Sequence, residues 1–349
     1  MTPAAATLHG CSEPLCVRYD CAMLDLDGVV YRGTAAIPGV PDRLRRASEA
    51  GMTLAFVTNN AARTPEGVAS QLRDLGIDAS SADVVTSAQA AAREVATRVP
   101  AGARVLVVGG EGLEVALREH GLAPVASLSD DPAAVVQGFH PDVGWRQLAE
   151  AAYAVAADVP WVASNLDMTV PTAAGIAPGN GSLVAAVAAA VGHGPDVVAG
   201  KPHRPLFDET LLRIGAERPL VVGDRLDTDI EGANRCGADS LLVMTGVTDV
   251  AALCRAGPAG RPSYVAWTLD GLLTPHAAPE LHHGVWRCED WVVSIADGAL
   301  TVNEPGADRA VGLRAVTAAA WRWYDDREPV AGAAEELDIT DACRTLRAS

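Results

Sequence analysis

Short apolar runs alternate with longer amphipathic stretches along most of this chain. Residues 21–24 and 52–57 are apolar runs of strand length, and residues 38–51 between them carry apolar side chains at helical spacing. Thr64-Pro65 then marks a helix start, because threonine is a favoured N-cap and proline suits the first helical position. This order with tight loops predicts a doubly wound parallel sheet.

The same rhythm continues further along the chain. Strands are predicted at 104–110, 133–139, 161–164, 196–200, 218–222 and 240–244, and helices at 113–120, 145–157 and 206–214. We expect a second α/β unit at about 86–194, after which the rhythm of the first sheet resumes. Gly109-Gly110-Glu111-Gly112 lacks the spacing of a dinucleotide-binding loop, so it predicts a tight strand-to-helix turn and disfavours a dehydrogenase.

The last 82 residues, 268–349, have a different pattern. Residues 286–295 and 299–302 predict a β-hairpin turning at Asp297-Gly298, and 313–324 predict a helix with one apolar face. A ββα piece needs a neighbour to cover that face. Three arrangements would cover it: the piece packs on the core, forms a dimer contact, or belongs to an acetyltransferase-like module. The third has little support, because the sequence shows no glycine-rich loop for the pyrophosphate of acetyl-CoA. We expect a structural or regulatory role.

Composition bounds the class of protein. With 349 residues, 49% of them hydrophobic, the chain is long enough for two or three domains. The net charge is −17 and no basic patch occurs, so we expect no nucleic acid partner. A phosphate site in such a chain must be made positive locally.

Nothing in the chain predicts insertion in a membrane or export. The longest apolar run, 183–191, is far shorter than the ~20 residues of a membrane span. Residues 1–10 lack the features of a signal peptide. The seven cysteines form no C-x-x-C pair, and although the spacing of Cys11, Cys16 and Cys21 is compatible with a metal site, reduced thiols are favoured. We therefore expect a cytoplasmic protein.

Polar side chains follow four of the predicted strands directly. They are Asp25 and Asp27; Thr58, Asn59 and Asn60; Lys201; and Asp224 with Asp229. Carboxyl ends of neighbouring parallel strands meet at one edge of a sheet, where ligands bind. Each group alone is compatible with an ordinary turn, but all four in this order indicate a site.

The residue types suit cleavage of a phosphate ester. Carboxylates such as Asp25 and Asp224 are hard ligands for Mg²⁺, and a hydroxyl and a lysine hold phosphoryl oxygens. One carboxylate of the 25/27 pair attacks phosphorus, and the other transfers the proton.

As a set, these segments resemble the motifs of the haloacid dehalogenase (HAD) superfamily of phosphatases. Asp25-Leu26-Asp27-Gly28-Val29 is similar to its motif I, 58–60 to motif II, 200–202 to motif III, and 223–230 to motif IV. Val29-Val30-Tyr31 and 181–191 resemble the NagD-like, para-nitrophenylphosphatase branch, which includes bacterial glycerol-phosphate phosphatases.

The resemblance implies a role for each residue. Asp25 is the nucleophile and a metal ligand, and Asp27 is the general acid/base and binds Mg²⁺ through its carbonyl. Asp224 is a metal ligand, and Asp229 holds metal-bound water. The phosphate is bound by Thr58, Asn59, Asn60 and Lys201. A second aspartate at 27 favours phosphate esters, because the dehalogenases of this superfamily lack it.

The resemblance also implies a domain division. The core is expected at 17–85 and 195–267, a C2-type cap at 86–194, and the extension at 268–349. Candidate cap contacts to substrate are Gly138–His140, with His140 the side chain of choice, and Asn165–Asp167. A homodimer through the cap or the extension is possible.

These expectations lead to a small phosphate monoester as substrate. Glycerol 3-phosphate is the first expectation, from the resemblance alone, and 2-phosphoglycolate or pyridoxal phosphate are alternatives. A phosphometabolite sensor without activity is the competing class, which the intact pair Asp25 and Asp27 argues against.

Overall fold

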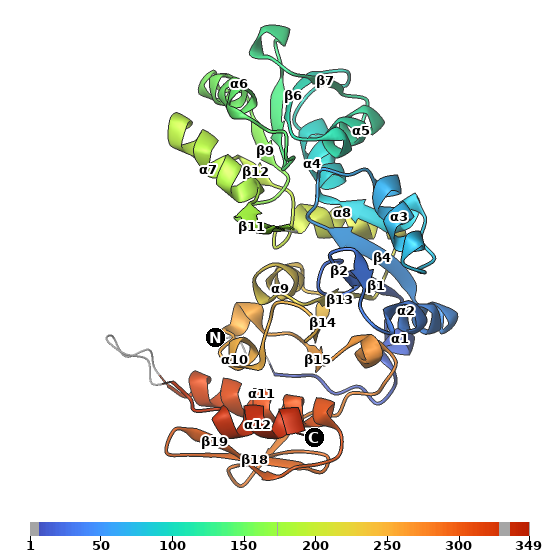
Figure 1. Ribbon diagram of the computed structural model, residues 1–349, viewed down its shortest axis with the longest axis vertical. Coiled ribbons are helices and arrows are strands. Elements are labelled where there is room, and N and C mark those ends of the chain that lie inside the picture. The colour runs from blue at the N-terminus through green and yellow to red at the C-terminus, as the bar shows by residue number, and fades with distance from the viewer. Residues whose placement is uncertain (1–6, 173, 328–335, 349) are drawn as a thin grey trace. The chain divides into compact units, whose positions relative to one another are not determined.

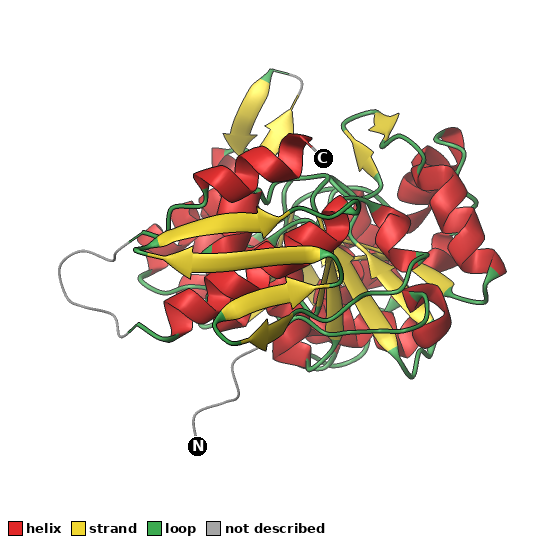
Figure 2. Cartoon of the chain, turned by 90° about the horizontal axis from the view of Figure 1, so that it is seen from below, coloured by secondary structure: helices red, strands yellow, loops and turns green. Residues whose placement is uncertain are grey.

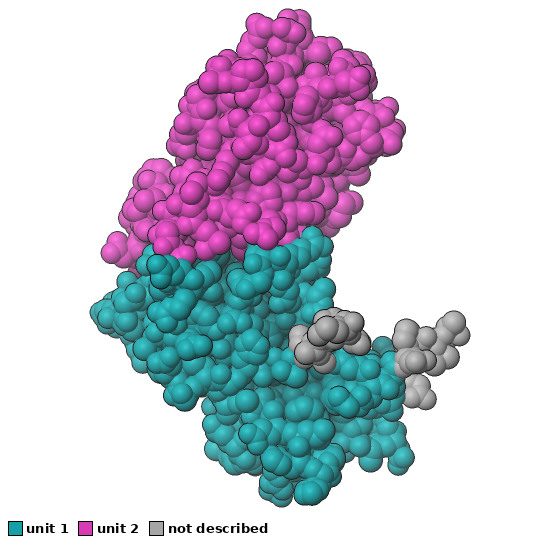
Figure 3. Space-filling view, turned by 180° about the vertical axis from the view of Figure 1, so that it is seen from behind, with its two compact units in different colours: residues 1–32, 36–54, 217–349 teal, residues 33–35, 55–216 magenta. Residues whose placement is uncertain are grey.

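The chain forms two compact units. The computed structural model describes residues 7–172, 174–327 and 336–348. Unit 1 comprises residues 1–32, 36–54 and 217–349, and unit 2 comprises 33–35 and 55–216, as Figure 3 colours them. Both are α/β structures with parallel strands.

Unit 1 is built on four neighbouring parallel strands in the order β15-β14-β13-β1 (Figure 1). These are β1 (Cys21–Leu24), β13 (Pro219–Gly223), β14 (Asp239–Val243) and β15 (Tyr264–Ala266). Its first helices are α1 (Leu15–Arg18), α2 (Val40–Glu49), α9 (Glu231–Cys236) and α10 (Val250–Cys254), with a π-helical turn at Leu226–Ile230 and 3₁₀ turns at Pro258–Gly260 and Leu269–Leu272. Three short or shared strands are β2 (Tyr31–Arg32), β3 (Ala35–Ala36) and β4 (Thr53–Thr58), the last of which begins in unit 1 and ends in unit 2.

The C-terminal part of unit 1 is larger than the predicted hairpin and helix. Its antiparallel sheet has four strands: β16 (Glu280–His282), β17 (Val285–Cys288), β18 (Trp291–Ala296) and β19 (Ala299–Glu304). Helices α11 (Arg309–Asp325) and α12 (Thr340–Ala348) pack on this sheet, as Figure 2 shows from its strand side.

The predictions for this region are partly confirmed. The hairpin turn at Asp297-Gly298 is present, with φ of 49° and 74°, as a type I′ turn requires. The predicted strand 286–295 is wrong, because the chain reverses within it at Glu289, where φ is 49°. The helix begins four residues earlier than expected, since the Asp308 side chain accepts a hydrogen bond from the Ala310 N–H at 2.7 Å.

Helix α11, the longer helix of the C-terminal part, shares a hydrophobic core with the parallel strands. Trp291 and Trp321 lie in one buried cluster with Leu242 of β14 and Leu253 of α10. The Trp321 indole also donates a hydrogen bond to the Leu253 carbonyl at 2.8 Å. Of the three options that the sequence left open, packing on the core is thus confirmed.

An ion pair with a buried guanidinium helps to hold α11 in this position. Arg261 is 2% exposed and donates to both carboxylate oxygens of Asp325, each at 2.7 Å. Its guanidinium also lies 5.0 Å from the centre of the Trp321 ring. A charged pair joined by two parallel hydrogen bonds is stronger, and fixes the two side chains more precisely, than an exposed ion pair with a single bond.

Unit 2 contains the end of β4 paired in parallel with β5 (Val84–Thr86) and a second parallel sheet in the order β12-β9-β8-β6-β7. The strands are β6 (Arg104–Val108), β7 (Ala123–Val125), β8 (Ala134–Gln137), β9 (Trp161–Ala163) and β12 (Val197–Val198), with a hairpin of β10 (Thr169–Thr172) and β11 (Gly175–Pro178). The helices are α3 (Pro65–Asp74), α4 (Ser87–Ala96), α5 (Glu111–Glu119), α6 (Trp145–Ala156), α7 (Asn180–Val191) and α8 (Arg204–Ile214), with 3₁₀ turns at Ser81–Asp83 and Leu128–Asp130.

One strand lies in a different sheet from the one expected. The strand before Lys201 was predicted to continue the first sheet, but β12 pairs in parallel with β9 of the second. Asp196 determines this pairing, because its carboxylate accepts the Trp161 N–H at 2.8 Å and its own N–H donates to the Trp161 carbonyl at 2.9 Å.

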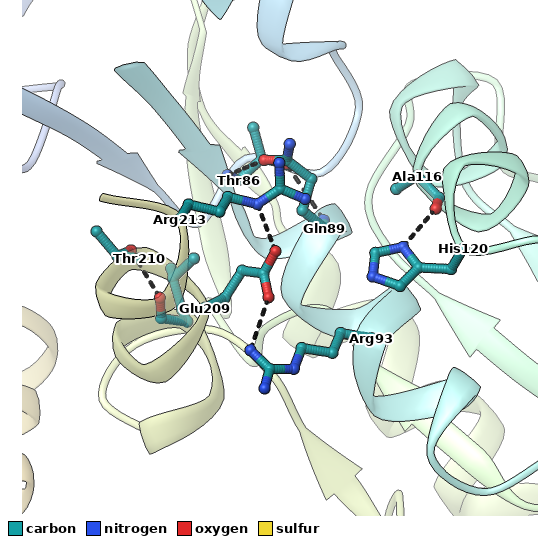
Figure 4. A network of polar contacts seen from close by, with 9 residues as sticks. Thr86, Gln89, Arg93, Ala116, His120, Glu209, Thr210 and Arg213 are labelled. Carbon is teal, nitrogen blue, oxygen red and sulfur yellow. Dashed lines mark hydrogen bonds and ion pairs between the residues drawn. The ribbon is translucent and has the colours of Figure 1, made fainter. Parts of the chain in front are cut away.

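Helix α8, which follows Lys201, is held against α4 by a buried carboxylate (Figure 4). Glu209 accepts a hydrogen bond from Arg93 of α4 at 3.1 Å and another from Arg213 of its own helix. The start of α4 is fixed by reciprocal hydrogen bonds between Thr86 and Gln89. These contacts hold α8 and, with it, the C-terminal side of the segment around Lys201.

None of the described helices has the length and hydropathy that crossing a membrane requires. All seven cysteines lie in the described part of the chain and are present as thiols.

We predict that Asp325→Ala lowers the free energy of unfolding by roughly 3 kcal/mol, because it leaves the Arg261 charge buried without its carboxylate. The matched control is Asp326→Ala, which removes an exposed pair with Arg322 and costs at most about 0.5 kcal/mol. Denaturant titration of both variants measures the difference, and equal midpoints would contradict the prediction.

A second prediction concerns acid. Burial, with the nearby Arg314 charge, lowers the pKa of His276 from 6.5 to about 4. The unfolded chain therefore binds this proton at a higher pH than the folded one, so stability is full above pH 6.5 and falls as the pH drops towards 4. The slope from this group is at most about 1.4 kcal/mol per pH unit.

His276→Gln removes this contribution, because glutamine does not titrate and its amide can still donate to the Gly271 carbonyl, as the imidazole does at 2.8 Å. Thermal midpoints between pH 4 and 7 test it. The control is His193→Gln at an exposed position, which keeps the wild-type slope. The same slope in His276→Gln would show that other groups cause the acid sensitivity.

Candidate functional site

The first and the last of the four predicted strand ends lie side by side in unit 1. Strands β1 and β13 are parallel neighbours, with Leu24 opposite Val222. The Asp25 N–H donates to the Val222 carbonyl at 2.9 Å, so Asp25 continues the ladder beside the start of the Asp224 loop. The expected convergence of these two aspartates is therefore observed.

Three carboxylates form a cluster at this point. One oxygen each from Asp25, Asp224 and Asp229 lies within 4.8 Å of the others. Asp224 and Asp229 are each 1% exposed, and Asp25 is half-buried. Three negative groups so close and so buried require a cation, and an all-oxygen carboxylate set suits a hard divalent metal. The residues present thus fit the predicted Mg²⁺.

Glycines allow the chain to close around Asp224. Gly28 has a φ of 85°, and a Cβ there would lie 2.5 Å from the Asp224 carboxylate. A Cβ at Gly246 would also overlap this carboxylate, which accepts the Val247 N–H at 2.6 Å. Our sequence reasoning missed the loop 245–248, although it follows strand β14 directly and the strand-end criterion applies to it.

Asp229 is itself a member of the carboxylate cluster, whereas the resemblance gave it only the task of holding metal-bound water. The π-helical turn 226–230 brings it back towards Gly223, and its carboxylate accepts the Arg225 N–H at 3.1 Å. Asp227 in the same turn is exposed and pairs with Arg225, as expected of a surface residue.

Asp27 lies in a tight loop after β1 and outside the cluster of three. The Leu26 carbonyl accepts hydrogen bonds from the N–H groups of Val30 and Tyr31, at 2.8 and 3.1 Å. This turn leaves Asp27 exposed, while its neighbours Leu26 and Gly28 are buried. Exposure suits a group that exchanges protons.

In unit 2, Thr58 and Asn60 build the turn that ends β4. The Thr58 hydroxyl accepts the Asn60 N–H at 3.1 Å, and the Asn60 amide oxygen accepts the Ala62 N–H at 2.9 Å. The Asn60 side chain thus shapes the turn. Because the Thr58 hydroxyl oxygen only accepts in this hydrogen bond, its own hydrogen can be donated to another acceptor.

The side chain of Asn59 clamps the main chain of Lys201. Its amide oxygen accepts the Lys201 N–H at 2.8 Å, and its amide nitrogen donates to the Lys201 carbonyl at 3.1 Å. The Asn59 side chain, expected to bind phosphate, is therefore engaged by the protein, and only its main chain is left for that task. Lys201 itself is 4% exposed, and its Nζ donates to the Val57 carbonyl at 3.3 Å.

His140 and the glycine loop 109–112 lie beside the segment that follows Asn60. The Gly112 N–H donates to the Ala62 carbonyl at 3.2 Å, and a Cβ at Gly112 would lie 2.5 Å from the Ala61 carbonyl. The glycines therefore admit a neighbouring chain segment, which agrees with the predicted tight turn. His140 is half-buried and its Nδ1 accepts the Asp142 N–H at 3.3 Å.

Two family models match the chain. Residues 22–123 match the haloacid dehalogenase-like hydrolases, and residues 198–272 match the related HAD-hydrolase-like model. Together, these two ranges contain the carboxylate cluster, Asp27, the Thr58–Asn60 turn and Lys201, but not His140.

Similar proteins extend this match to most of the chain. The D-glycerol 3-phosphate phosphatase of Mycobacterium tuberculosis is 43% identical over 311 residues, which are 87% of this chain and 86% of that protein. An acid sugar phosphatase of Staphylococcus aureus is 36% identical over 66% of this chain and 88% of its own length.

Solved structures agree with the sequence matches. The glycerol phosphate phosphatase from M. tuberculosis in complex with calcium has a TM-score of 0.85 at 40% identity, covering 96% of this chain and 98% of that one. A 4-nitrophenylphosphatase from Thermotoga maritima has a TM-score of 0.68 at 30% identity and covers 74% and 98%. From these matches, the chain belongs to the haloacid dehalogenase-like hydrolases.

Proposed function

We propose that this protein is a Mg²⁺-dependent phosphatase of glycerol 3-phosphate. The observation that carries the proposal is the cluster of Asp25, Asp224 and Asp229 in a chain 43% identical to an enzyme of that name. The M. tuberculosis enzyme has also been solved with magnesium, at a TM-score of 0.81 and 42% identity over 89% of this chain and 92% of that one.

Asp25, Asp224 and the main-chain carbonyl of Asp27 would hold the metal, with Asp229 beside them. When bound, Mg²⁺ supplies positive charge that offsets these carboxylates and the substrate phosphate. The net charge of −17 gives this local compensation particular weight.

The chain's own residues carry the reaction. The Asp25 carboxylate attacks phosphorus, and the bond from phosphorus to the alcohol oxygen breaks as Asp27 donates a proton to that oxygen. An aspartyl-phosphate at Asp25 and the free alcohol result. Asp27, now a carboxylate, takes a proton from a water molecule that attacks the phosphorus and releases phosphate.

The phosphate-binding residues are Thr58, Asn59, Asn60 and Lys201, and the Asn59 side chain contacts the main chain of Lys201. The Thr58 hydroxyl and the Lys201 ammonium hold phosphoryl oxygens, and the main-chain N–H groups of Asn59 and Asn60 add donors. Lys201 is nearly buried, so its charge acts in a medium where it is screened less than at the surface.

We propose that a cap selects the substrate, as the family resemblance implies. We propose a core at 17–85 and 195–267, a cap at 86–194 and an extension at 268–349, with His140 of the cap contacting the substrate. The seven thiols suit a reducing compartment, and we propose the cytoplasm.

The substrate proposal predicts a ranking. Among glycerol 3-phosphate, 2-phosphoglycolate, pyridoxal phosphate and sugar phosphates, kcat/KM with Mg²⁺ is highest for glycerol 3-phosphate, and EDTA abolishes turnover. Sugar phosphates are included because one relative is named an acid sugar phosphatase. A higher kcat/KM for another ester would replace the substrate, and binding without turnover would indicate a sensor.

The mechanism predicts that Asp25→Asn lowers kcat by at least about 10³-fold, because an amide is not a nucleophile here. The matched control is Asp227→Asn, an exposed aspartate of the 224–230 loop, which keeps near wild-type activity. Para-nitrophenyl phosphate turnover measures both, and substantial activity in Asp25→Asn would exclude Asp25 as nucleophile.

We also propose a homodimer that forms through the cap or the extension. Trp145 at the start of α6 is 76% exposed and Tyr153 of the same helix is 54% exposed, so the cap offers apolar surface. Light scattering should give twice the chain mass, and Trp145→Asp should reduce it if the cap mediates contact. A monomer mass for the unaltered protein would contradict the proposal.

A further inference from the structure

Asp167 contacts the residue that clamps Lys201. It lies in unit 2, in the loop between β9 and β10, far in sequence from both Asn59 and Lys201. The Asn59 amide nitrogen approaches its two carboxylate oxygens at 3.2 and 3.4 Å, while donating to the Lys201 carbonyl at 3.1 Å. One side chain therefore joins the Asp167 loop to the main chain of Lys201.

The contact with Asp167 reinforces the orientation of the Asn59 amide. An amide flipped by 180° would place its oxygen against the Asp167 carboxylate and its nitrogen against the Lys201 N–H, so two acceptors and two donors would face each other. The carboxylate accepts from the nitrogen in the observed orientation only. Asp167 thus favours the same amide orientation as the two main-chain groups of Lys201 and adds a third contact that holds it.

The surrounding loop is itself held to the same point. The Asn59 carbonyl accepts the Ser87 hydroxyl at 2.6 Å and the Asn165 amide nitrogen at 2.7 Å. The Asp167 N–H donates to the Asn165 amide oxygen at 3.0 Å, so Asp167 and Asn165 are positioned together. At Gly200, before Lys201, a Cβ would lie 2.6 Å from both the Asn59 amide oxygen and the Ser164 carbonyl.

We propose that Asp167 is a positioning residue for the phosphatase reaction, which acts through Asn59 to fix the main chain of Lys201. This inference rests on the proposed function, in which the Lys201 ammonium holds a phosphoryl oxygen. It gives Asp167 a role different from the direct substrate contact that its place in the cap suggested.

The test compares two substrates in the full-length protein with Mg²⁺. A positioning residue serves the phosphate that all substrates share, whereas a specificity residue serves the alcohol part. Asp167→Ala should therefore lower kcat by about 10- to 100-fold on both glycerol 3-phosphate and para-nitrophenyl phosphate, with KM changed less than about threefold. A fall on glycerol 3-phosphate alone would overturn the proposal in favour of a substrate contact.

The conservative variant separates positioning from general stability. Asp167→Asn keeps an oxygen acceptor for the Asn59 amide, so its kcat should return to within about fivefold of the wild type on both substrates. Asp74→Ala, at an exposed position of α3 in the same unit, is the matched control and keeps full activity. Thermal midpoints are measured for each variant, and if Asp167→Ala does not fold, Asp167→Asn still has to show equal effects on both substrates.

A double variant tests the route through Asn59. In the background of Asn59→Ala, Asp167→Ala should lower kcat by less than about twofold further, because the intermediary is already absent. Additive losses would overturn the proposal. If the wild type hydrolyses para-nitrophenyl phosphate but not glycerol 3-phosphate, the substrate proposal fails and the positioning role is still decided on the first ester. If it hydrolyses neither, both fail.

Discussion

Three carboxylates held within 4.8 Å of one another are the constraint on which the site in unit 1 depends. Two of them are almost fully buried, and in an interior of low polarity such a cluster is strongly unfavourable without compensating charge and donors. The surrounding backbone supplies part of that compensation. N–H groups of Val247 and Arg225 point at Asp224 and Asp229, and glycines at 28 and 246 let the chain approach where a side chain would not fit.

Much of this arrangement could be predicted from the sequence. A polar residue that follows an apolar run lies at the end of a strand, and parallel strands bring such ends together, which was enough to place Asp25 beside Asp224. The position of Asp229 depends on a π-helical turn, which no local pattern indicated. The strand before Lys201 was assigned to the wrong sheet, because pairing of β12 with β9 rests on Asp196, a contact between residues 35 positions apart.

Asn59 shows another limit of sequence reasoning. Its motif indicated that it lies near phosphate, but a motif does not reveal whether an amide faces a ligand or its own protein. The structure uses both ends of that amide for the main chain of Lys201. The turn in the C-terminal sheet was missed for a related reason. The chain reverses at Glu289, which has a positive φ although it is neither glycine nor asparagine, so no typical turn residue marked this position in the sequence.

The shared core of α11 has a consequence for synthesis of the protein. Leu242 and Leu253 belong to segments that leave the ribosome well before Trp321, which covers them in the finished structure. Until α11 emerges, the growing chain must expose this apolar face. Completion of the parallel-strand region of unit 1 therefore waits for α11, and during that interval the nascent chain is a natural client for chaperones that shield hydrophobic surface.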